Sequence, residues 1–361
     1  MYAKLLGLLA VVLLSAQIGL ACTGVTLVAQ DGTVISARSL EFGIDLDAAL
    51  LFVPRGYKLT ADLGDGKQGA TWTPRYACLG INFFGQPFLG EGLNEAGLGC
   101  GAFYLPGYAQ FTPPGEAKPE QAVLSVHVVS WILGNCATVA ETKQRIHEIT
   151  VVSGKLPQVP LEMPLHFRVT DATGASLVIE YTQGGTLKLH DAPLGVITNS
   201  PTYDWHITNL GNYTSLQAAD VPKLELEGQT IAEFGMGSGL RGLPGDYSPA
   251  ARFVRAAILQ GLAKQAADVK AGVNLALHLL NNVDIPVGPA ASLVNGQDHF
   301  DRTEWVSVSD LTNRVFYFRT YENLQLRRAT LDSFDPQSKQ VQSFPLEPAA
   351  WYQDVGAAAT K

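Results

Sequence analysis

The pattern of apolar and polar residues predicts strands over much of the first hundred residues, at residues 23–29, 33–37 and 50–54 among others. Residues 23–28 alternate like a buried strand, and residues 50–54 are a short apolar run. A glycine-punctuated region at residues 90–101 then leads into a further apolar segment at 102–105. The pattern predicts that this part of the chain is built from strands.

Further along the chain, apolar residues recur at the spacing of an amphipathic helix. Helices are predicted at residues 120–133, 137–149, 249–264 and 269–280. Strands are predicted at residues 165–169 and 176–181, which form a hairpin, and at 186–190, 194–198, 305–309 and 314–321. The helices are grouped between two sets of strands, so we expect an α+β fold with sheets packed on each other and helices outside.

The chain shows no internal repeat and no long linker rich in proline, serine or glycine. We therefore expect residues 22–361 to form a single domain, preceded by a targeting segment. Lys4 is followed by an apolar run at residues 5–14 and by the small residues before Cys22, as in a secretory signal peptide.

Removal of residues 1–21 would leave a protein that is secreted or periplasmic. Two alternatives stay open for this segment. It is short for a retained membrane anchor, which needs roughly 20 apolar residues. A lipoprotein signal would acylate Cys22, although Gly19 stands where such signals usually have leucine.

Composition narrows the class of protein. The chain has 361 residues, of which 47% are hydrophobic and 16% charged, so a large core is available and disorder is not expected. The net charge is −8, and no run of lysine and arginine occurs, which argues against nucleic acid or an anionic membrane surface as a partner. The seven histidines lack metal-site spacing, so no metal is expected.

Four cysteines are present, at positions 22, 78, 100 and 136. If Cys22 is catalytic, at most one disulfide can form among the other three, or all three are small buried apolar residues. Cys22 itself would become the first residue after signal cleavage. Its thiol, with an ordinary pKa of about 8.5, would then lie beside an α-amino group with a pKa of about 8, which can act as its base.

Several separate blocks of the chain resemble the choloylglycine hydrolase family, which contains conjugated bile salt hydrolases and penicillin V acylases. The blocks are CTGV at 22–25, ARSLEF at 37–42, VPRGY at 53–57, EGLNEAGL at 91–98, TNSPTYDW at 198–205, GLPGDYSP at 242–249 and ARF at 251–253. The resemblance covers nearly all of the chain after residue 21. It implies a four-layer αββα sandwich of two antiparallel sheets with outer helices, the fold of N-terminal nucleophile hydrolases.

The resemblance implies roles for six residues. Cys22 matches the nucleophile, and Arg38 matches an arginine beside the thiol that favours thiolate. Glu41 stands where the family usually has an aspartate that holds the α-amino group. The extra methylene of glutamate moves the carboxylate by about 1.5 Å, so the contact is expected to differ.

Three further positions match the family's later blocks. Asn199 matches a side-chain donor of the oxyanion hole, and Tyr104 matches a position whose backbone N–H completes that hole. Arg252 matches an arginine near the cysteine that stabilises developing charge. Taken alone, Asn199 is also a good turn residue, Tyr104 a core residue, and Arg252 a solvent-facing residue at a helix start.

These residues predict a hydrolase of carbon–nitrogen bonds in linear amides that acts through a thioester and needs no cofactor. Tyr104 favours penicillin V-like amides, acyl homoserine lactones or other N-acyl amides as the small-molecule substrate. Conjugated bile salts are the near alternative, and a lipid-anchored, inactive binding protein is a more distant one. The resemblance also implies a homotetramer, with no stable membrane insertion after processing.

Overall fold

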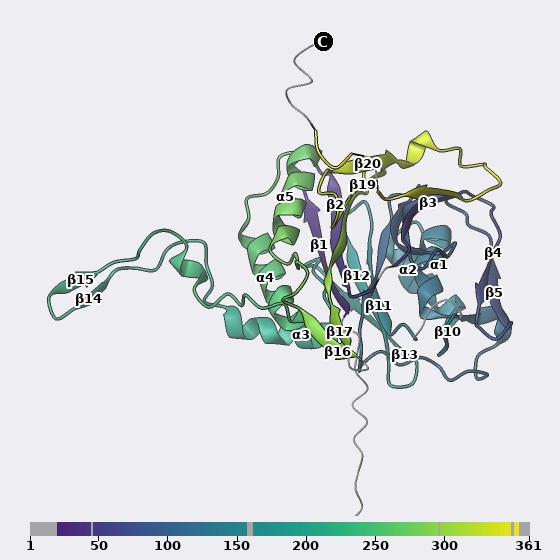
Figure 1. Cartoon of the computed structure of the whole chain (residues 1–361), viewed down its shortest axis with the longest axis horizontal. Helices are drawn as coiled ribbons and strands as arrows, with labels where there is room; N and C mark the ends of the chain where they lie inside the picture. The colour runs from purple at the N-terminus through teal and green to yellow at the C-terminus, as the bar shows by residue number, and fades with distance from the viewer. Residues whose placement is uncertain (1–19, 45, 157–161, 295–296, 348–349, 354–361) are drawn as a thin grey trace, which may run out of the picture.

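The computed structural model describes residues 20–44, 46–156, 162–294, 297–347 and 350–353, and these residues form two large antiparallel sheets (Figure 1). The first sheet has five strands in the order β1 (Leu20–Val28), β2 (Val34–Phe42), β18 (Arg302–Asp310), β19 (Val315–Thr320) and β20 (Arg327–Thr330). The neighbouring strands β2 and β18 come from opposite ends of the chain.

The second sheet has eight strands and contains most of the middle of the chain. Their order is β13 (Thr186–Asp191), β12 (Ser176–Thr182), β11 (Leu165–Thr170), β8 (Gly99–Tyr104), β7 (Leu89–Asn94), β6 (Cys78–Asn82), β3 (Ala49–Val53) and β21 (Gln342–Pro345). Strand β1 of the first sheet packs against β8 of the second, so the two sheets lie face to face.

Helices cover the outer face of each sheet. Helices α4 (Pro249–Leu262) and α5 (Val269–Asn281) pack on β1 and β2, and α5 also packs on β18. Helix α1 (Val128–Asn135) packs on β7 and β8, and α2 (Val139–Arg145) follows it on the same side (Figure 1). The result is the αββα sandwich that the sequence resemblance implied.

Local sequence explains where the two long helices begin. Ser248 accepts a hydrogen bond from the N–H of Ala251, and Pro249 occupies the first position of α4. Asp268 caps α5 in the same way through the N–H of Ala271. These boundaries agree with the predicted helices at 249–264 and 269–280.

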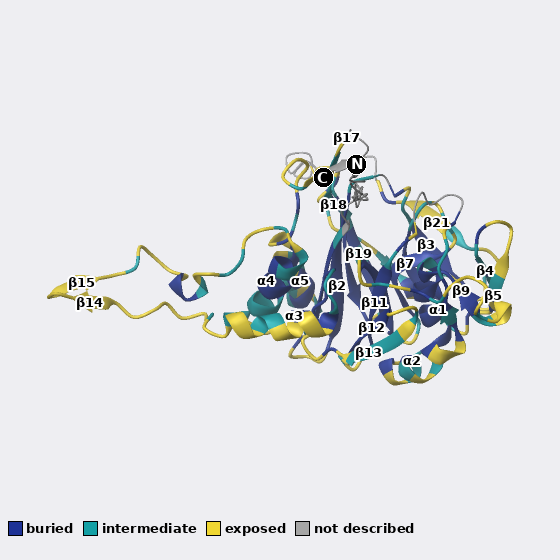
Figure 2. Ribbon diagram, turned by 90° about the horizontal axis from the view of Figure 1, so that it is seen from below, coloured by how far each residue is buried: buried dark blue, intermediate teal, exposed yellow. Residues whose placement is uncertain are grey.

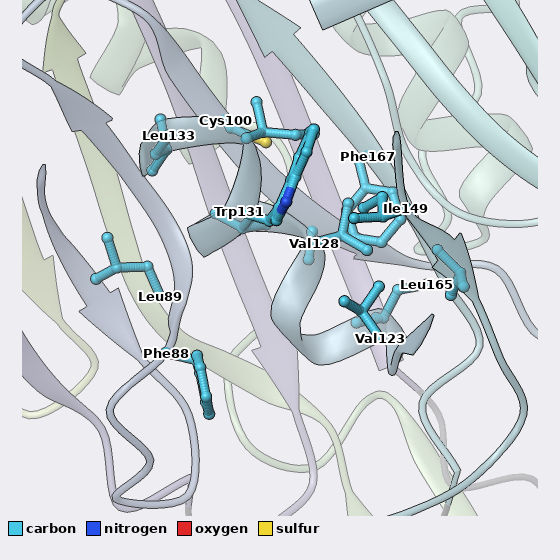
Figure 3. Close-up of a cluster of buried hydrophobic side chains, with 14 of the residues drawn as sticks. Phe88, Leu89, Cys100, Val123, Val128, Trp131, Leu133, Ile149, Leu165 and Phe167 are labelled. Carbon is cyan, nitrogen blue, oxygen red and sulfur yellow. The ribbon is translucent and has the colours of Figure 1, made fainter. Parts of the chain in front are cut away.

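Two buried clusters fill the space between the layers (Figure 2). One lies between α1 and the eight-stranded sheet, and Figure 3 shows Trp131, Cys100 and Phe167 within it. The other lies between the sheets and under α4 and α5, and it includes Cys22, Phe103 and Phe253. All four cysteines are buried and free, so the possible disulfide is not formed.

Two predicted elements are wrong. Residues 120–133 do not form one helix, because Ala122 and Val123 form the short strand β9 (Ala122–Val123), which pairs in parallel with β10 (Thr150–Val151). The α-helix begins only at Val128. The apolar residues before it are buried by strand pairing instead of by one helical face.

The predicted strand at residues 194–198 is also absent as a strand. After β13 the backbone of this segment pairs with β1 at one isolated bridge, between Ile197 and Gly24. This bridge replaces a regular ladder and leads the chain to Asn199. Asn199 therefore follows an isolated bridge and is not part of a strand.

The sequence patterns did not predict several small elements. They are α3 (Tyr203–Asn209), the two-stranded pairs β4 (Leu59–Asp62) with β5 (Gln68–Trp72), β14 (Leu224–Leu226) with β15 (Gln229–Ile231) and β16 (Ala291–Val294) with β17 (Gln297–Phe300). The hairpin of β14 and β15 extends away from the sandwich in both overall views (Figures 1 and 2). Within the described ranges, no helix has the length and apolarity needed to cross a membrane.

Candidate active site

Cys22 lies on β1, and the pairing of β1 with β2 determines which side chains share its face of the sheet. Cys22 is opposite Leu40, and Gly24 is opposite Arg38, whereas Ala21 is opposite Glu41. Because side chains alternate between faces, Cys22 and Arg38 point between the two sheets. Glu41 occupies the alternate face, toward α4 and α5.

Arg38 is fully buried and contacts the thiol directly. Its Nη2 donates to the sulfur of Cys22 at 2.8 Å, and its Nη1 donates to the carbonyl oxygen of Ala102 at 2.6 Å on the opposite sheet. The guanidinium lies 4.4 Å from the ring centroid of Phe103 and 5.1 Å from that of Trp305. A cation is thereby held in a fixed position against the sulfur.

Burial and charge act in opposite directions on the thiol. Burial raises the pKa of Cys22, and Glu41 adds to that effect. Arg38, Arg252 and a backbone hydrogen bond from Tyr104 lower the pKa. The structure therefore places two cations and one backbone donor around a desolvated sulfur, the arrangement that favours the thiolate once its proton has a base to accept it.

Asn199 approaches Cys22 from the loop between β13 and α3. Its Oδ1 accepts a hydrogen bond from the backbone N–H of Cys22 at 2.8 Å and another from Nη2 of Arg252 at 2.6 Å. Its Nδ2 donates to the carbonyl oxygen of Tyr104 at 2.8 Å. The side chain joins Cys22 to β8, where Tyr104 lies, and is buried rather than exposed in a surface turn.

Arg252 lies in the first turn of α4, yet it is fully buried, so the alternative of a solvent-facing arginine is wrong. Its Nη1 donates to the carbonyl oxygen of Cys22 and, at 2.7 Å, to Oγ1 of Thr23. Burial lowers the pKa of Arg252, while Glu41 and Cys22 oppose that effect. Helix α4 thus brings a second cation to the backbone of Cys22.

Glu41 is fully buried and has little hydrogen bonding. Thr303 on β18 donates to its Oε1 at 3.2 Å, and Oε2 has no hydrogen-bond partner among the described residues. Burial raises its pKa to about 7, although the charges of Arg252 and Arg38 and the hydroxyls of Ser39 and Thr303 oppose that rise. The N–H of Cys22 is bound by Asn199 instead of by Glu41.

Tyr104 contributes its backbone to the site and its ring to a neighbouring pocket. Burial raises the pKa of its hydroxyl. The pocket is lined by Tyr104, Pro106, Gln110 and Phe111 among others, and it opens beside the strand that carries the Tyr104 N–H. The Tyr104 side chain belongs to the buried cluster that also contains α1 residues, whereas the ring of its neighbour Phe103 lies in the cluster that contains Cys22.

The structure brings all six predicted residues to one place, and it adds four that the sequence analysis did not single out. Glu91 lies 3.7 Å from Arg38, and His166, Glu180 and His206 surround the Asn199 loop. Only Glu91 lies in a motif that carries the family resemblance. The other three lie outside these motifs, and no pattern in the sequence marks them as part of the site.

Within the part of the chain that the structure describes, no group of three or more histidine, cysteine, aspartate or glutamate side chains is arranged to hold a metal ion.

Comparison with known proteins gives a consistent result. The model of the family described as linear amide C–N hydrolases, choloylglycine hydrolase family, matches residues 22–342. A bile salt hydrolase/transferase of Clostridium perfringens is 30% identical over 327 residues, which are 90% of this chain and 96% of that protein. A penicillin V acylase of Pectobacterium atrosepticum is 26% identical over 79% of this chain and 74% of that protein.

A solved structure is similar over almost its whole length. The crystal structure of a variant of conjugated bile acid hydrolase from Clostridium perfringens superimposes with a TM-score of 0.82 at 29% sequence identity. The match covers 92% of this chain and all of that chain. The overall arrangement of this chain is therefore similar to that of a conjugated bile acid hydrolase.

Proposed function

Since the chain belongs to the choloylglycine hydrolase family and is therefore a hydrolase of carbon–nitrogen bonds other than peptide bonds in linear amides, we propose that it cleaves an N-acyl amide with Cys22 as nucleophile. One observation carries the proposal: Arg38, Tyr104 and Asn199 converge on the thiol and the nitrogen of a single residue. The family match also begins at Cys22 itself.

The first half of the reaction forms a thioester. After removal of residues 1–21, the free α-amino group of Cys22 takes the thiol proton, and the thiolate attacks the amide carbonyl carbon. The N–H of Tyr104 and the side-chain amide of Asn199 donate to the carbonyl oxygen as it becomes negative. The C–N bond breaks, and the α-ammonium group returns its proton to the leaving amine.

The second half releases the acid. Water loses a proton to the same α-amino group and attacks the thioester carbonyl, and the sulfur leaves as the Cys22 thiolate. Glu41 is the candidate that holds the α-ammonium group. Its Oε2 is buried without a hydrogen-bond partner in the described chain, and it lies on the residue opposite Ala21, next to the bond that must be cut.

A substrate panel tests this proposal. Processed wild type and Cys22→Ala are assayed for amine release from penicillin V, conjugated bile salts and acyl homoserine lactones. We expect hydrolysis by wild type, at least a thousandfold loss in Cys22→Ala at an unchanged melting temperature, and an intact mass that starts at Cys22. Normal turnover by Cys22→Ala, or an active chain that retains Met1, contradicts the mechanism.

The substrate that we propose first is an aryl or alkyl N-acyl amide such as penicillin V, because the sequence resemblance matches Tyr104 to a position where some penicillin V acylases have tyrosine. Conjugated bile salts are the second candidate, and the observation that favours them is the higher identity to bile salt hydrolases, 30% against 26% for the penicillin V acylase. The ratio of kcat/KM for the two substrates decides between them.

We also propose that the protein is exported, on the basis of the apolar segment at residues 5–14 and the small residues before Cys22. Cell fractionation combined with the intact mass tests this step. A mass gain equal to a diacylglycerol on Cys22 would instead support the lipid-anchored, inactive alternative, because an acylated cysteine has neither a free thiol nor a free amine.

Self-association is part of the proposal as well. The hairpin formed by β14 and β15 and the residues after it expose apolar side chains, with Phe234 and Met236 almost fully accessible and Leu224 and Leu226 more than half exposed. A second copy of the chain is the partner that we propose for this surface. Light scattering should report a homotetramer in wild type and smaller species in a Phe234→Ser, Met236→Ser double variant, while a monomeric wild type contradicts the proposal.

A further inference from the structure

Three buried side chains outside the six predicted residues surround the loop that carries Asn199. They are His166 on β11, Glu180 on β12 and His206 on α3, and each is at most 2% exposed. Buried polar side chains are costly unless they are hydrogen-bonded, so such a group must be explained by what it binds.

The two imidazoles bind consecutive backbone carbonyl groups. Nε2 of His166 lies 3.0 Å from the carbonyl oxygen of Thr198, and Nε2 of His206 lies 2.8 Å from that of Asn199. A carbonyl oxygen can only accept, so each Nε2 carries a proton and donates it. The peptide groups on both sides of the Asn199 Cα are therefore bound from outside the loop.

Glu180 links the ring of His166 to the start of α3, the helix that carries His206. Its Oε1 lies 3.2 Å from Nδ1 of His166 and accepts the N–H of Tyr203 at 2.9 Å, at the start of the helix that carries His206. Its Oε2 lies 3.4 Å from Nε2 of His190. One carboxylate thus fixes both the ring of His166 and the first turn of α3.

His206 is held from the other side by α4. Its ring stacks on Phe253 with a centroid distance of 4.7 Å and an interplanar angle of 12°. Phe253 follows Arg252, which donates to Oδ1 of Asn199. Two adjacent residues of α4 consequently act on Asn199. Arg252 binds its side chain directly, and Phe253 packs on the ring of His206, which binds its backbone carbonyl.

We propose that His166 and His206, tied together by Glu180, are positioning residues that fix the backbone of Asn199 so that its side-chain amide faces the carbonyl oxygen of the substrate. The inference rests on the proposed function. Its physical basis is that Asn199 lies beyond the isolated bridge between Ile197 and Gly24 and belongs to no strand ladder. A planar peptide group whose oxygen is bound cannot rotate freely, and two such groups determine the direction of the side chain between them.

The protonation states agree with this arrangement. Burial lowers the pKa of His206 to about 4, so at neutral pH the ring is uncharged and has its single proton on Nε2. For Glu180, burial acts to raise the pKa, but hydrogen bonds from His166, His190 and Tyr203 lower it to about 2. With Glu180 ionised, both ring nitrogens of His166 face acceptors.

The test replaces the donor and then restores it. His206→Leu removes the Nε2 donor, whereas His206→Gln places an amide N–H near the same position. On the best substrate of the panel, we expect His206→Leu to lower kcat about tenfold to a hundredfold with KM changed less than threefold, and His206→Gln to recover most of the rate. His278→Leu, at an exposed position on α5, is the matched control and should keep the wild-type kcat.

A readout that does not depend on activity separates this inference from the proposed function. Crystal structures of the processed variants should show that the contact between Asn199 Nδ2 and the Tyr104 carbonyl, 2.8 Å in wild type, is lost in His206→Leu and restored in His206→Gln. If Asn199 keeps its position in His206→Leu, the inference is overturned, whatever the rate. If wild type hydrolyses no substrate of the panel, the proposed function fails, and the crystal structures alone decide the inference.

A variant that does not fold would leave the first comparison without a result, so a second pair is included. His206→Asn keeps a polar side chain that is too short to reach the carbonyl oxygen of Asn199, and His206→Gln is long enough. Equal kcat values for these two folded variants contradict the positioning role. A lower kcat in His206→Asn at equal KM supports it.

Discussion

Two fully buried glutamates, one in each large sheet, have environments of opposite character. Glu41 on β2 has one hydrogen bond, from Thr303, and its other oxygen has no hydrogen-bond partner among the described residues. Glu180 on β12 is bound by His166 and by the N–H of Tyr203, with His190 close to its second oxygen. The pKa is raised to about 7 in Glu41 and lowered to about 2 in Glu180.

The difference shows that burial alone does not determine the charge of a carboxylate. Desolvation penalises the ionised form of both carboxylates and so acts to raise both pKa values. The number and charge of the partners decide whether the final pKa lies above or below its ordinary value. Oε1 of Glu180 accepts two hydrogen bonds, and its Oε2, although without a hydrogen-bond partner among the described residues, lies 3.4 Å from Nε2 of His190. Oε2 of Glu41 also lacks a hydrogen-bond partner among the described residues, and the α-ammonium group that we propose to form at Cys22 is a cation that could supply one.

The largest expected effect comes from removing the well-bound carboxylate. Glu180→Leu leaves His166, the N–H of Tyr203 and His190 without their acceptor, so we expect the free energy of unfolding to fall by about 3–5 kcal/mol. Urea unfolding followed by tryptophan fluorescence measures this change.

A surface carboxylate is the control for that experiment. Asp191 pairs with Lys143, but its side chain is 78% exposed, so Asp191→Asn should cost at most about 1 kcal/mol. A loss below 1 kcal/mol in Glu180→Leu would mean that the network around the Asn199 loop contributes little to the fold.

The two carboxylates should also give opposite dependences of stability on pH. Glu180 binds protons less tightly in the folded chain than in the unfolded chain. Its contribution to the free energy of unfolding is therefore present above pH 4.5 and is lost as the pH falls toward 2. Glu41, in the chain that still contains Ala21, binds protons more tightly when folded. Its contribution is present below pH 4.5 and is lost as the pH rises through 7.

Urea unfolding across this pH range, with Glu180→Gln and Glu41→Gln compared against the same uncleaved wild type, measures the two contributions. The free energy of unfolding of wild type minus that of Glu180→Gln should grow from pH 2 to 4.5. The free energy of unfolding of wild type minus that of Glu41→Gln should fall from pH 4.5 to 7. Slopes of the same sign for both variants would contradict the contrast between the two regions.

The smallest effect is expected at Glu41, the position where the resemblance implied an aspartate. In the processed enzyme, Glu41→Gln removes the charge that we propose to hold the α-ammonium group, and kcat/KM should fall about tenfold, or ~1.4 kcal/mol in activation free energy. Glu41→Asp keeps the charge and should change kcat/KM less than threefold. Equal rates for the two variants would show that the charge at this position does not act on Cys22.

How much of the site could be predicted depends on how local its signals are. Cys22, Arg38 and Glu41 lie on adjacent strands whose alternation is visible in the sequence, so their register follows once β1 and β2 pair. Asn199 and Arg252 were found through motifs, although the patterns wrongly assigned residues 194–198 to a strand. His166 and Glu180 lie in predicted strands, and His206 directly follows the block at 198–205, but nothing in these patterns marks the three as part of the site, and the structure alone identifies them.

The sequence by itself determined the strand and helix patterns, the family and six candidate residues, because periodicity and motifs are properties of neighbouring positions. Tertiary structure alone decided which groups meet. Cys22 and Asn199 are 177 residues apart, and the hydrogen bond between them forms only because the bridge at Gly24 brings the loop to β1. The charge states of Glu41 and Glu180 were decided in the same way, since a buried carboxylate takes its pKa from partners that packing supplies.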